Sequence, residues 1–514
     1  MTHWIGRALL LHSRLRMHRV ARWKKDPATT QERLLLSLVR AARHTRFGRE
    51  HSFESIRSPR DFQSRVPLRE YLDFKPYWDR LFEGERDVTW PGRIRYFAIT
   101  SGTTAGNKLI PLSAEGVRSQ IRSGRDAVLF YLALTRNTDL FAGKFLYLGG
   151  STDLRRGPND TLIGDLSAIA AIETPRFVHR FRLPSMQVNF IADWEKKLEA
   201  MAQEALAQDV RGISGTPSWM MCLFERVLEL RSRSGRPSEA LAEVWPHLSL
   251  IVHGGCSFEP YRKSFAHIIG KPVTTLEVYA ASEGFIAIQD RPDENDLLLL
   301  MDRGIFYEFV PVEELGHPEP HRFTVADAET GVNYAIVLTT DSGLWGYVIG
   351  DTVRLTSLRP HRLRITGRTK QFLNAFGEHV IVEEVEEAIA EACKATGAEV
   401  QEFHIAPLFP ERGVSRPVHQ WLIEFKRPPA DALTFRDVAD GVLQRRNDDY
   451  AAHRRSNAGM LPPEIHPLPA GTFFETMKSL GKLGGQHKVP RLANDRNFAE
   501  SLLQVALRRH RAPC

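Results

Sequence analysis

The sequence predicts an α/β fold with a large N-terminal domain and a small α+β C-terminal domain. In the first half, mostly apolar strand segments alternate with amphipathic helices, which indicates mostly parallel sheets with helices on both faces. The strands are expected at residues 144–149, 210–214, 248–253 and 273–279, and the helices at 194–206 and 218–230. Between residues 306 and 355, strand-like segments follow one another with few helix signals, which predicts an antiparallel or β-barrel-like subdomain.

The C-terminal part changes to a mixture of helices and strands. Residues 382–395 place Val382, Val385, Ile389 and Ala392 on one face at steps of three and four, which predicts an amphipathic helix. Strands at 401–405 and 419–425 and a helix at 435–447 are expected to follow. We therefore expect a large domain over residues 1–367 and a small domain over residues 368–514.

Composition narrows the class of protein. The 514 residues are 42% hydrophobic and 25% charged, which is the mixture of a globular protein large enough to bury a sizeable core. The four cysteines are Cys222, Cys256, Cys393 and Cys514. They show no C-x-x-C pair and no metal-ligand spacing, which argues against a disulfide framework or a zinc site and favours the cytoplasm. No apolar run approaches the roughly 18 residues of a membrane span, and no signal peptide is expected.

The net charge of +7 is concentrated at the start of the chain. Residues 1–50 hold twelve Lys and Arg against three Asp and Glu, an excess of nine. A basic amphipathic start can make weak peripheral contact with acidic lipid or bind nucleic acid. A solvated helical face packed on the body is the simpler explanation. No aromatic-interleaved basic pattern is present, so no nucleic-acid partner is expected.

Local signals divide the region before residue 100. Residues 1–60 are expected to be helical, with a capping box formed by Thr29 and Glu32 at the start of one helix. Pro67 and Pro76 are expected to break the segment that follows. A long helix is expected within residues 112–134.

The start of this long helix is marked by Ser113, a residue that commonly caps helices. Its apolar face is expected to run through Val117, Ile121 and Val128. Gly116 and Gly124 count against the helix, because glycine is a poor helix former.

A glycine- and hydroxyl-rich loop follows the strand expected at residues 94–99. Its sequence is T-S-G-T-T-A-G-N-K-L-I-P at residues 100–111. Inward N–H groups, hydroxyls and one ammonium together form a nest suited to phosphate. It is not a common P-loop, because Gly102 and Gly106 enclose only three residues and Asn107 precedes Lys108. A flexible surface turn is the alternative.

Later strand ends and loops also carry polar clusters, where ligands of parallel sheets bind. In Y-A-A-S-E (279–283), Glu283 can hold Mg²⁺ through oxygen or can simply begin a helix. In Y-V-I-G-D (347–351), Asp351 can accept hydrogen bonds from ribose or can belong to a plain turn. Lys488 lies in a C-terminal loop with three glycines, which can also be a basic surface loop.

Taken in order, these motifs resemble the adenylate-forming superfamily, which includes acyl-CoA synthetases and firefly luciferase. Within it the sequence is most similar to the bacterial branch of the auxin-responsive acyl-acid amido synthetases, the Gretchen Hagen family. The motifs are the 100–111 loop, Y-A-A-S-E-G at 279–284, Y-V-I-G-D at 347–351, F-L-N-A-F-G-E-H-V at 372–380, G-G-Q-H-K-V-P-R at 484–491 and H-T-R-F-G-R-E-H at 44–51. The resemblance covers nearly the whole chain and implies a large ATP- and acyl-substrate-binding domain followed by a mobile C-terminal domain.

The resemblance also implies roles for single residues. The β- and γ-phosphates of ATP would contact Ser101, Thr103, Thr104 and Lys108. The adenine and α-phosphate would lie against Gly254, Gly255, Ala281 and Ser282, with Glu283 holding Mg²⁺. Asp351 would bind the ribose beside Arg368, while His379 lies near a nucleotide-contacting lysine of the family. Lys488 would close over the α-phosphate, so that Lys488, Glu283 and Lys108 are the catalytic residues.

Two departures from the family pattern concern the ribose side. Gly346 and Val348 stand where many relatives have arginine, and His379 replaces the lysine.

The implied reaction is a two-step ligation with ATP and Mg²⁺ as cofactors. A carboxylic acid would form an acyl-adenylate and release pyrophosphate, and an amine, expected to be an amino acid, would then take the acyl group. An acyl-CoA ligase that passes the acyl group to a thiol is the second hypothesis. A nucleotide-binding or membrane-associated protein without turnover is the third.

Overall fold

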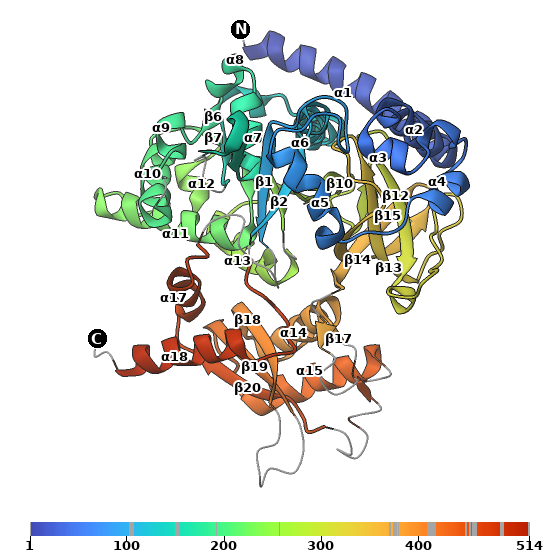
Figure 1. Cartoon of the computed structure of the whole chain (residues 1–514). Coiled ribbons are helices and arrows are strands. Elements are labelled where there is room, and N and C mark those ends of the chain that lie inside the picture. The colour runs from blue at the N-terminus through green and yellow to red at the C-terminus, as the bar shows by residue number, and fades with distance from the viewer. Residues whose placement is uncertain are drawn as a thin grey trace. The chain divides into compact units, whose positions relative to one another are not determined.

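The computed structural model describes two compact units (Figure 1). The described residues are all except 1, 102–106, 150–153, 192, 256–257, 370–371, 374–377, 379, 409–417, 448–449, 452–453, 455–459, 484–487 and 512–514. The large unit comprises residues 1–256, 264–364 and 484–486, and the small unit comprises 257–263, 365–483 and 487–514. The division of function between residues 1–367 and 368–514 stays a prediction.

An eleven-stranded sheet forms the centre of the large unit, in the order β12-β13-β14-β15-β11-β10-β9-β8-β7-β3-β6. Its strands are β3 (Lys144–Tyr147), β6 (Arg182–Leu183), β7 (Val210–Gly215), β8 (Leu250–Gly254), β9 (Thr274–Ala280), β10 (Phe285–Ile288), β11 (Leu297–Leu299), β12 (Ile305–Pro311), β13 (Asn333–Thr340), β14 (Tyr347–Leu358) and β15 (His361–Arg368). The apolar runs become buried strands as predicted; Leu250 and Ile251 of β8, for example, are fully buried. The predicted α/β class is therefore confirmed.

The direction of the strands changes within this sheet. The neighbours from β6 to β9 pair in parallel. From β9 onward, β10, β11 and β15 pair antiparallel, as do β12, β13 and β14. The strands expected between residues 306 and 355 are thus antiparallel and continue the same sheet.

A second sheet of the large unit carries the glycine- and hydroxyl-rich loop. Its order is β2-β1-β5-β4, with β1 (Tyr96–Ser101), β2 (Asn107–Leu112), β4 (Arg155–Arg156) and β5 (Leu162–Gly164). Strands β1 and β2 form an antiparallel hairpin in which Thr100 faces Lys108.

Thirteen α-helices are described in the first 270 residues. They are α1 (Thr2–Lys25), α2 (Pro27–Ala42), α3 (Arg46–Glu50), α4 (Pro59–Arg65), α5 (Tyr71–Phe82), α6 (Ala114–Thr135), α7 (Leu166–Glu173), α8 (Arg176–His179), α9 (Met186–Asn189), α10 (Trp194–Leu206), α11 (Pro217–Arg233), α12 (Leu241–Val244) and α13 (Arg262–Ile269). The expected cap of α6 is confirmed, because the Ser113 hydroxyl accepts the Gly116 N–H at 2.9 Å.

Two local predictions about helices are wrong. The capping box of Thr29 and Glu32 does not start α2; Asp26 is the N-cap, with its carboxylate accepting the Thr29 N–H at 3.2 Å. Aspartate followed by Pro27 is a better start, because proline at the first helical position loses no hydrogen bond. Pro76 does not break the chain and lies inside α5, where the buried face of this helix offsets the lost bond.

Helix α1 is held by buried ion pairs. Arg16 lies near Asp126 of α6, with a shortest distance of 2.8 Å, and Arg303 contacts the same carboxylate. Asp126 is fully buried, so it needs both guanidinium partners. Breaking one such pair typically costs about 3–5 kcal/mol.

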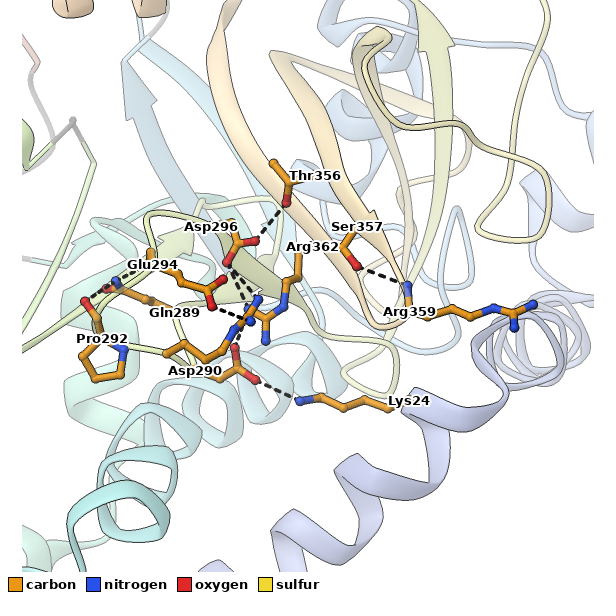
Figure 2. A network of polar contacts seen from close by, with 11 residues as sticks. Lys24, Gln289, Asp290, Pro292, Glu294, Asp296, Thr356, Ser357, Arg359 and Arg362 are labelled. Atoms are coloured by element: carbon orange, nitrogen blue, oxygen red, sulfur yellow. Dashed lines mark hydrogen bonds and ion pairs between the residues drawn. The ribbon is translucent and has the colours of Figure 1, made fainter.

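The end of α1 joins a second network, drawn in Figure 2. Lys24 contacts Asp290 at 2.9 Å, and Asp290 also contacts Arg362 of β15 at 2.6 Å. Arg362 reaches Asp296 at 3.1 Å, and the Thr356 hydroxyl donates to Asp296 at 3.0 Å. These bonds tie the N-terminal helix to the antiparallel half of the sheet.

The small unit has the mixed α+β content expected from the sequence. Strands β18 (Glu399–Leu408), β19 (Val418–Arg427) and β20 (Glu464–Leu468) form one sheet, and β16 (Phe372–Leu373) pairs with β17 (Val380–Ile381). Its longer helices are α14 (Val382–Thr396), α15 (Ala432–Arg446), α17 (Thr472–Ser479) and α18 (Asn497–Arg511). The predicted face of α14 is confirmed, since Val385, Ile389 and Ala392 are buried. Among the helices described, none combines the length and apolar character needed to cross a membrane.

The two glycines of α6 give a matched test of its packing. A Cβ at Gly116 would lie 1.8 Å from the Ser342 hydroxyl, whereas a Cβ at Gly124 would meet open space. Gly116→Ala is expected to lower the free energy of unfolding by about 1–3 kcal/mol through overpacking. Gly124→Ala is expected to raise it by about 0.5–1 kcal/mol, because alanine is the better helix former. Thermal unfolding of both variants measures this, and shifts of the same sign would contradict the described packing.

Candidate nucleotide and acyl-activation site

The predicted phosphate loop is the segment of sequence between β1 and β2. Thr103 and Thr104 fall outside the described residues, and Ser101 is described only as the last residue of β1. Lys108 of β2 pairs with Thr100 of β1, and its ammonium lies 5.4 Å from the centre of the Tyr71 ring. The Tyr71 hydroxyl accepts the Leu109 N–H at 3.1 Å, so α5 supports the strand that carries this lysine.

Two predicted glycines lie where β8 ends beside β9. A side chain at Gly254 would bring a Cβ within 2.4 Å of the Val278 carbonyl oxygen, so only glycine fits this close approach. Gly255 has a φ of +90°, which side chains disfavour. The chain therefore turns sharply at the carboxyl end of a parallel strand, the usual position of a ligand site.

The turn between β9 and β10 carries three of the predicted residues. Ala281 and Gly284 exchange backbone hydrogen bonds at 2.9 and 3.2 Å, which leaves Ser282 and Glu283 at the tip. Both tip residues are buried. Gln120 of α6 donates to the Ala281 carbonyl at 2.9 Å and so fixes the turn against that helix. Sequence reasoning missed Gln120, because it lies inside an ordinary helical pattern.

A direct hydrogen bond joins the second and third predicted motifs. The Tyr279 hydroxyl donates to Asp351 at 2.6 Å, across 72 residues of sequence. Tyr279 is the last but one residue of β9 and Asp351 lies within β14. Glu283 lies four residues after Tyr279 in the same motif, so this bond ties the motif of the predicted Mg²⁺ residue to the predicted ribose residue.

A small cavity of about 10 Å³, the space of one water, lies beside Glu283. It is lined by Leu112, Gly116, Ser119, Gln120, Glu283, Gly284, Phe285, Arg303, Ile305, Thr340, Asp341 and Ser342. Lys108 and Asp351 do not line it. The cavity therefore connects Glu283 to the start of α6 and does not by itself gather all three predicted residues.

Asp341 is a second carboxyl of this cavity that the sequence did not reveal. The Ser119 hydroxyl donates to it at 2.6 Å, and burial raises the pKa of Asp341 to about 7. Gly304 is required beside it, because a Cβ there would lie 2.1 Å from the Asp341 carboxylate. The only sequence signal was the turn-like run of residues 341–343.

In the small unit, the segment after Lys488 is anchored to β18. Lys488 is exposed. Two residues later, the Pro490 carbonyl accepts a hydrogen bond of 2.7 Å from His404 Nδ1, and Arg491 pairs with Glu402. Burial lowers the pKa of His404 to about 4, so its ring stays neutral and Nδ1 carries the donated proton. His404 is thus structural.

Arg368 and His379 are the remaining predicted residues. Arg368 ends β15 and is half-buried, directly after Gly367, whose φ is +152°. His379 falls outside the described residues. Its neighbour Glu378 is fully buried and lies 2.7 Å from His419, which links β19 to the segment that the sequence singled out.

Comparison with solved structures identifies the class of fold. The chain superposes on a 2-hydroxyisobutyryl-CoA ligase in complex with R3-HIB-AMP, with a TM-score of 0.58 and 14% identity, covering 94% of this chain and 93% of that one. It superposes better on the GH3.15 acyl acid amido synthetase, with a TM-score of 0.76 and 17% identity over 95% of both chains. The chain therefore shares its fold with these two enzymes.

Sequence comparison gives the family. The GH3 family N-terminal domain matches residues 16–274, the central domain 298–368 and the C-terminal domain 383–497. The chain therefore belongs to the GH3 family, as the motifs predicted. It is 20% identical to the jasmonoyl–L-amino acid synthetase GH3.5 of Oryza sativa subsp. japonica, over 94% of this chain and 95% of that protein. It is 22% identical to the indole-3-acetic acid-amido synthetase GH3.3 of Arabidopsis thaliana, over 94% of this chain and 92% of that protein.

The raised pKa of Asp341 predicts a pH-dependent stability. An unfolded aspartate loses its proton near pH 4, whereas the folded Asp341 keeps it to about pH 7. Over that window the folded state binds more protons, so its stability falls as pH rises. Asp341→Asn removes the ionisable carboxyl and with it the loss of stability at high pH. The melting temperature of the variant minus that of wild type is therefore expected to increase between about pH 5 and about pH 8. The exposed Asp293→Asn variant is the control, and a flat difference for Asp341→Asn would refute the assignment.

Proposed function

We propose that this chain is an ATP-dependent acyl-acid amido synthetase. The observation that supports it most is the Tyr279–Asp351 hydrogen bond of 2.6 Å, which joins two family motifs beside Glu283. Membership of the GH3 family adds to this, because its named relatives are amido synthetases for jasmonate or indole-3-acetic acid. The acyl substrate of this chain is a small carboxylic acid, and the acceptor is an amine such as an amino acid.

In the first step, the acid carboxylate attacks the α-phosphate of ATP and pyrophosphate leaves. The β- and γ-phosphates lie in the hairpin loop against Ser101, Thr103, Thr104 and Lys108, whose ammonium offsets their charge. The adenine and α-phosphate lie along Gly254, Gly255, Ala281 and Ser282, and Asp351 accepts hydrogen bonds from the ribose. Because both reactants are anions, the site must supply positive charge as they meet.

Glu283 fits the role of a magnesium ligand. Its carboxylate lies on a turn held on both sides, by the Ala281–Gly284 bonds and by Gln120. Among the described residues, no group of three or more His, Cys, Asp and Glu side chains gathers to hold a metal. That agrees with Mg²⁺, which usually takes one or two carboxylates and completes its shell with substrate phosphates and water. When bound, Mg²⁺ neutralises phosphate charge at this position.

The remaining cations come from the C-terminal domain, residues 368–514. Lys488 reaches the α-phosphate when this domain closes, Arg368 lies beside the ribose aspartate, and His379 takes a position near the nucleotide. Closure also keeps water from the acyl-adenylate. In the second step the amine attacks the acyl carbon, loses a proton and displaces AMP, so no protein nucleophile is required.

Lys488 has a matched control in Lys482, an exposed lysine of the same C-terminal loop. Lys488→Ala is expected to lower acid-dependent ATP–pyrophosphate exchange roughly hundredfold, because the charge that meets the α-phosphate is lost. Lys482→Ala is expected to leave exchange near the wild-type rate. Equal rates for the two variants would remove Lys488 from the mechanism.

Tyr279 tests the nucleotide side of the site. Tyr279→Phe removes the hydrogen bond of 2.6 Å that orients the Asp351 carboxylate. The KM for ATP is therefore expected to rise about tenfold, while the KM for the acid changes little. Tyr77→Phe removes a similar tyrosine–carboxylate bond at the surface, to Glu50 at 2.6 Å, and serves as the control. An unchanged KM for ATP in Tyr279→Phe would argue against nucleotide binding at Asp351.

The likeness to a 2-hydroxyisobutyryl-CoA ligase gives the competing function a specific basis. Product analysis separates the two. With ATP and a panel of acids, amino acids are expected to yield amides, whereas coenzyme A is expected to yield no thioester. Thioester formation without amide formation would replace the proposed function.

A further inference from the structure

Helix α1 has an inner face whose contacts fix its orientation. The Ser13 hydroxyl donates to the Leu129 carbonyl at 2.7 Å, and Arg16 contacts the buried Asp126. Val20 and Trp23 are buried on the same side. Because these contacts set the rotation of the helix about its axis, they also decide which side chains point outward.

The outer face of α1 combines leucines with cations. Leu11 and Leu15, one turn apart, keep 59% and 58% of their surface exposed. At about 3.6 residues per turn, the exposed Arg7, Arg14 and Arg22 fall on the same side of the helix. The exposed His18 and Lys25 extend this stripe toward the end of the helix. We call the exposed residues Arg7, Leu11, Arg14, Leu15, His18, Arg22 and Lys25 the outer face.

The cations of the outer face form no ion pair with the described residues. Helix α1 contains no Asp or Glu. Of its other cations, Arg16 and Lys24 form ion pairs with Asp126 and Asp290. In the part of the chain that the structure describes, no ion pair involves Arg7, Arg14, Arg22 or Lys25. The two exposed leucines thus lie one turn apart on a basic face, so this face is both apolar and positively charged.

We propose that the outer face of α1 binds the surface of an anionic lipid bilayer. The leucines enter the boundary between headgroups and acyl chains, and the cations meet the lipid phosphates. Nucleic acid would meet the cations and leave the leucines in water. A second copy of the chain, related by a two-fold axis, would bring these like-charged faces together. The charge and the leucines together therefore fit an acidic lipid surface, and the proposal does not depend on the reaction proposed above.

Vesicle flotation of the full chain tests this. Wild type is expected to float with vesicles of phosphatidylcholine and phosphatidylglycerol. It is expected not to float with vesicles of phosphatidylcholine alone. Leu11→Ser/Leu15→Ser is expected to lower the bound fraction roughly tenfold, because the inserted apolar surface is lost. Leu433→Ser/Leu507→Ser is the matched control, since each of these leucines is 59% exposed in the small unit.

The charged half of the proposal has its own pair of variants. Arg14→Ser/Arg22→Ser is expected to weaken binding and its response to salt, while the exposed Arg445→Ser/Arg508→Ser changes the net charge equally and leaves binding intact. Unchanged melting temperatures show that the outer face supports no folding contact.

Three results would overturn the proposal. One is equal flotation of the Leu11→Ser/Leu15→Ser variant and wild type, which would leave only charge attraction. Another is tight binding to single-stranded or duplex DNA that the leucine variant retains. The third is a concentration-dependent dimer, seen by sedimentation, that the leucine variant abolishes.

Discussion

The reversal of strand direction at the turn between β9 and β10 is the constraint on which the site depends. On one side of this turn the strands run parallel, and their carboxyl ends carry the sharp glycine turn at Gly254 and Gly255. On the other side the neighbouring strands run antiparallel, and β14, four strands from β9 in the sheet order, carries Asp351. The Tyr279–Asp351 bond then joins the two halves of the sheet.

Burial of charge is the second organising feature of the large unit. Asp126 forms ion pairs with Arg16 of α1 and with Arg303, which precedes β12. Arg362 forms ion pairs with Asp290 and Asp296. Each pair joins segments far apart in the sequence, and a buried charge that lost its partner would be costly. These pairs therefore specify which segments meet, beyond what apolar packing requires. Helix α1, although terminal, is part of the body for this reason.

Much of the fold was predictable because its signals are local. The apolar runs of β8 and β9 and the periodicity of α14 need only neighbouring residues to be recognised. The predictions that failed were also local, at Thr29 and Pro76, where a better cap nearby or tertiary packing decided the outcome. The family was predictable because its motifs are short, ordered and rich in residue types with specific chemistry.

The support of the site was not predictable, because it comes from long-range contacts. Gln120, Ser119 and Asp341 belong to no motif, and only the folded chain shows that they surround Glu283. The bond between Asp351 and Tyr279 joins β14 to β9, which are not neighbours in the sheet, so no local pattern predicts it. Roles assigned to Thr103, Thr104 and His379 rest on the resemblance to the family, since these residues fall outside the described part of the chain.

Helix α6 has a consequence for how the enzyme could change during evolution. Its first turns contact Ser342 through Gly116, Asp341 through Ser119 and the Glu283 turn through Gln120, and its middle is fixed to α1 through Asp126. Because α6 is held by several contacts along its length, it cannot slide or rotate toward a bulkier ligand without displacing the turn that carries Glu283. Changes that admit a ligand of another shape therefore fall on loops or neighbouring strands, while this helix keeps its position.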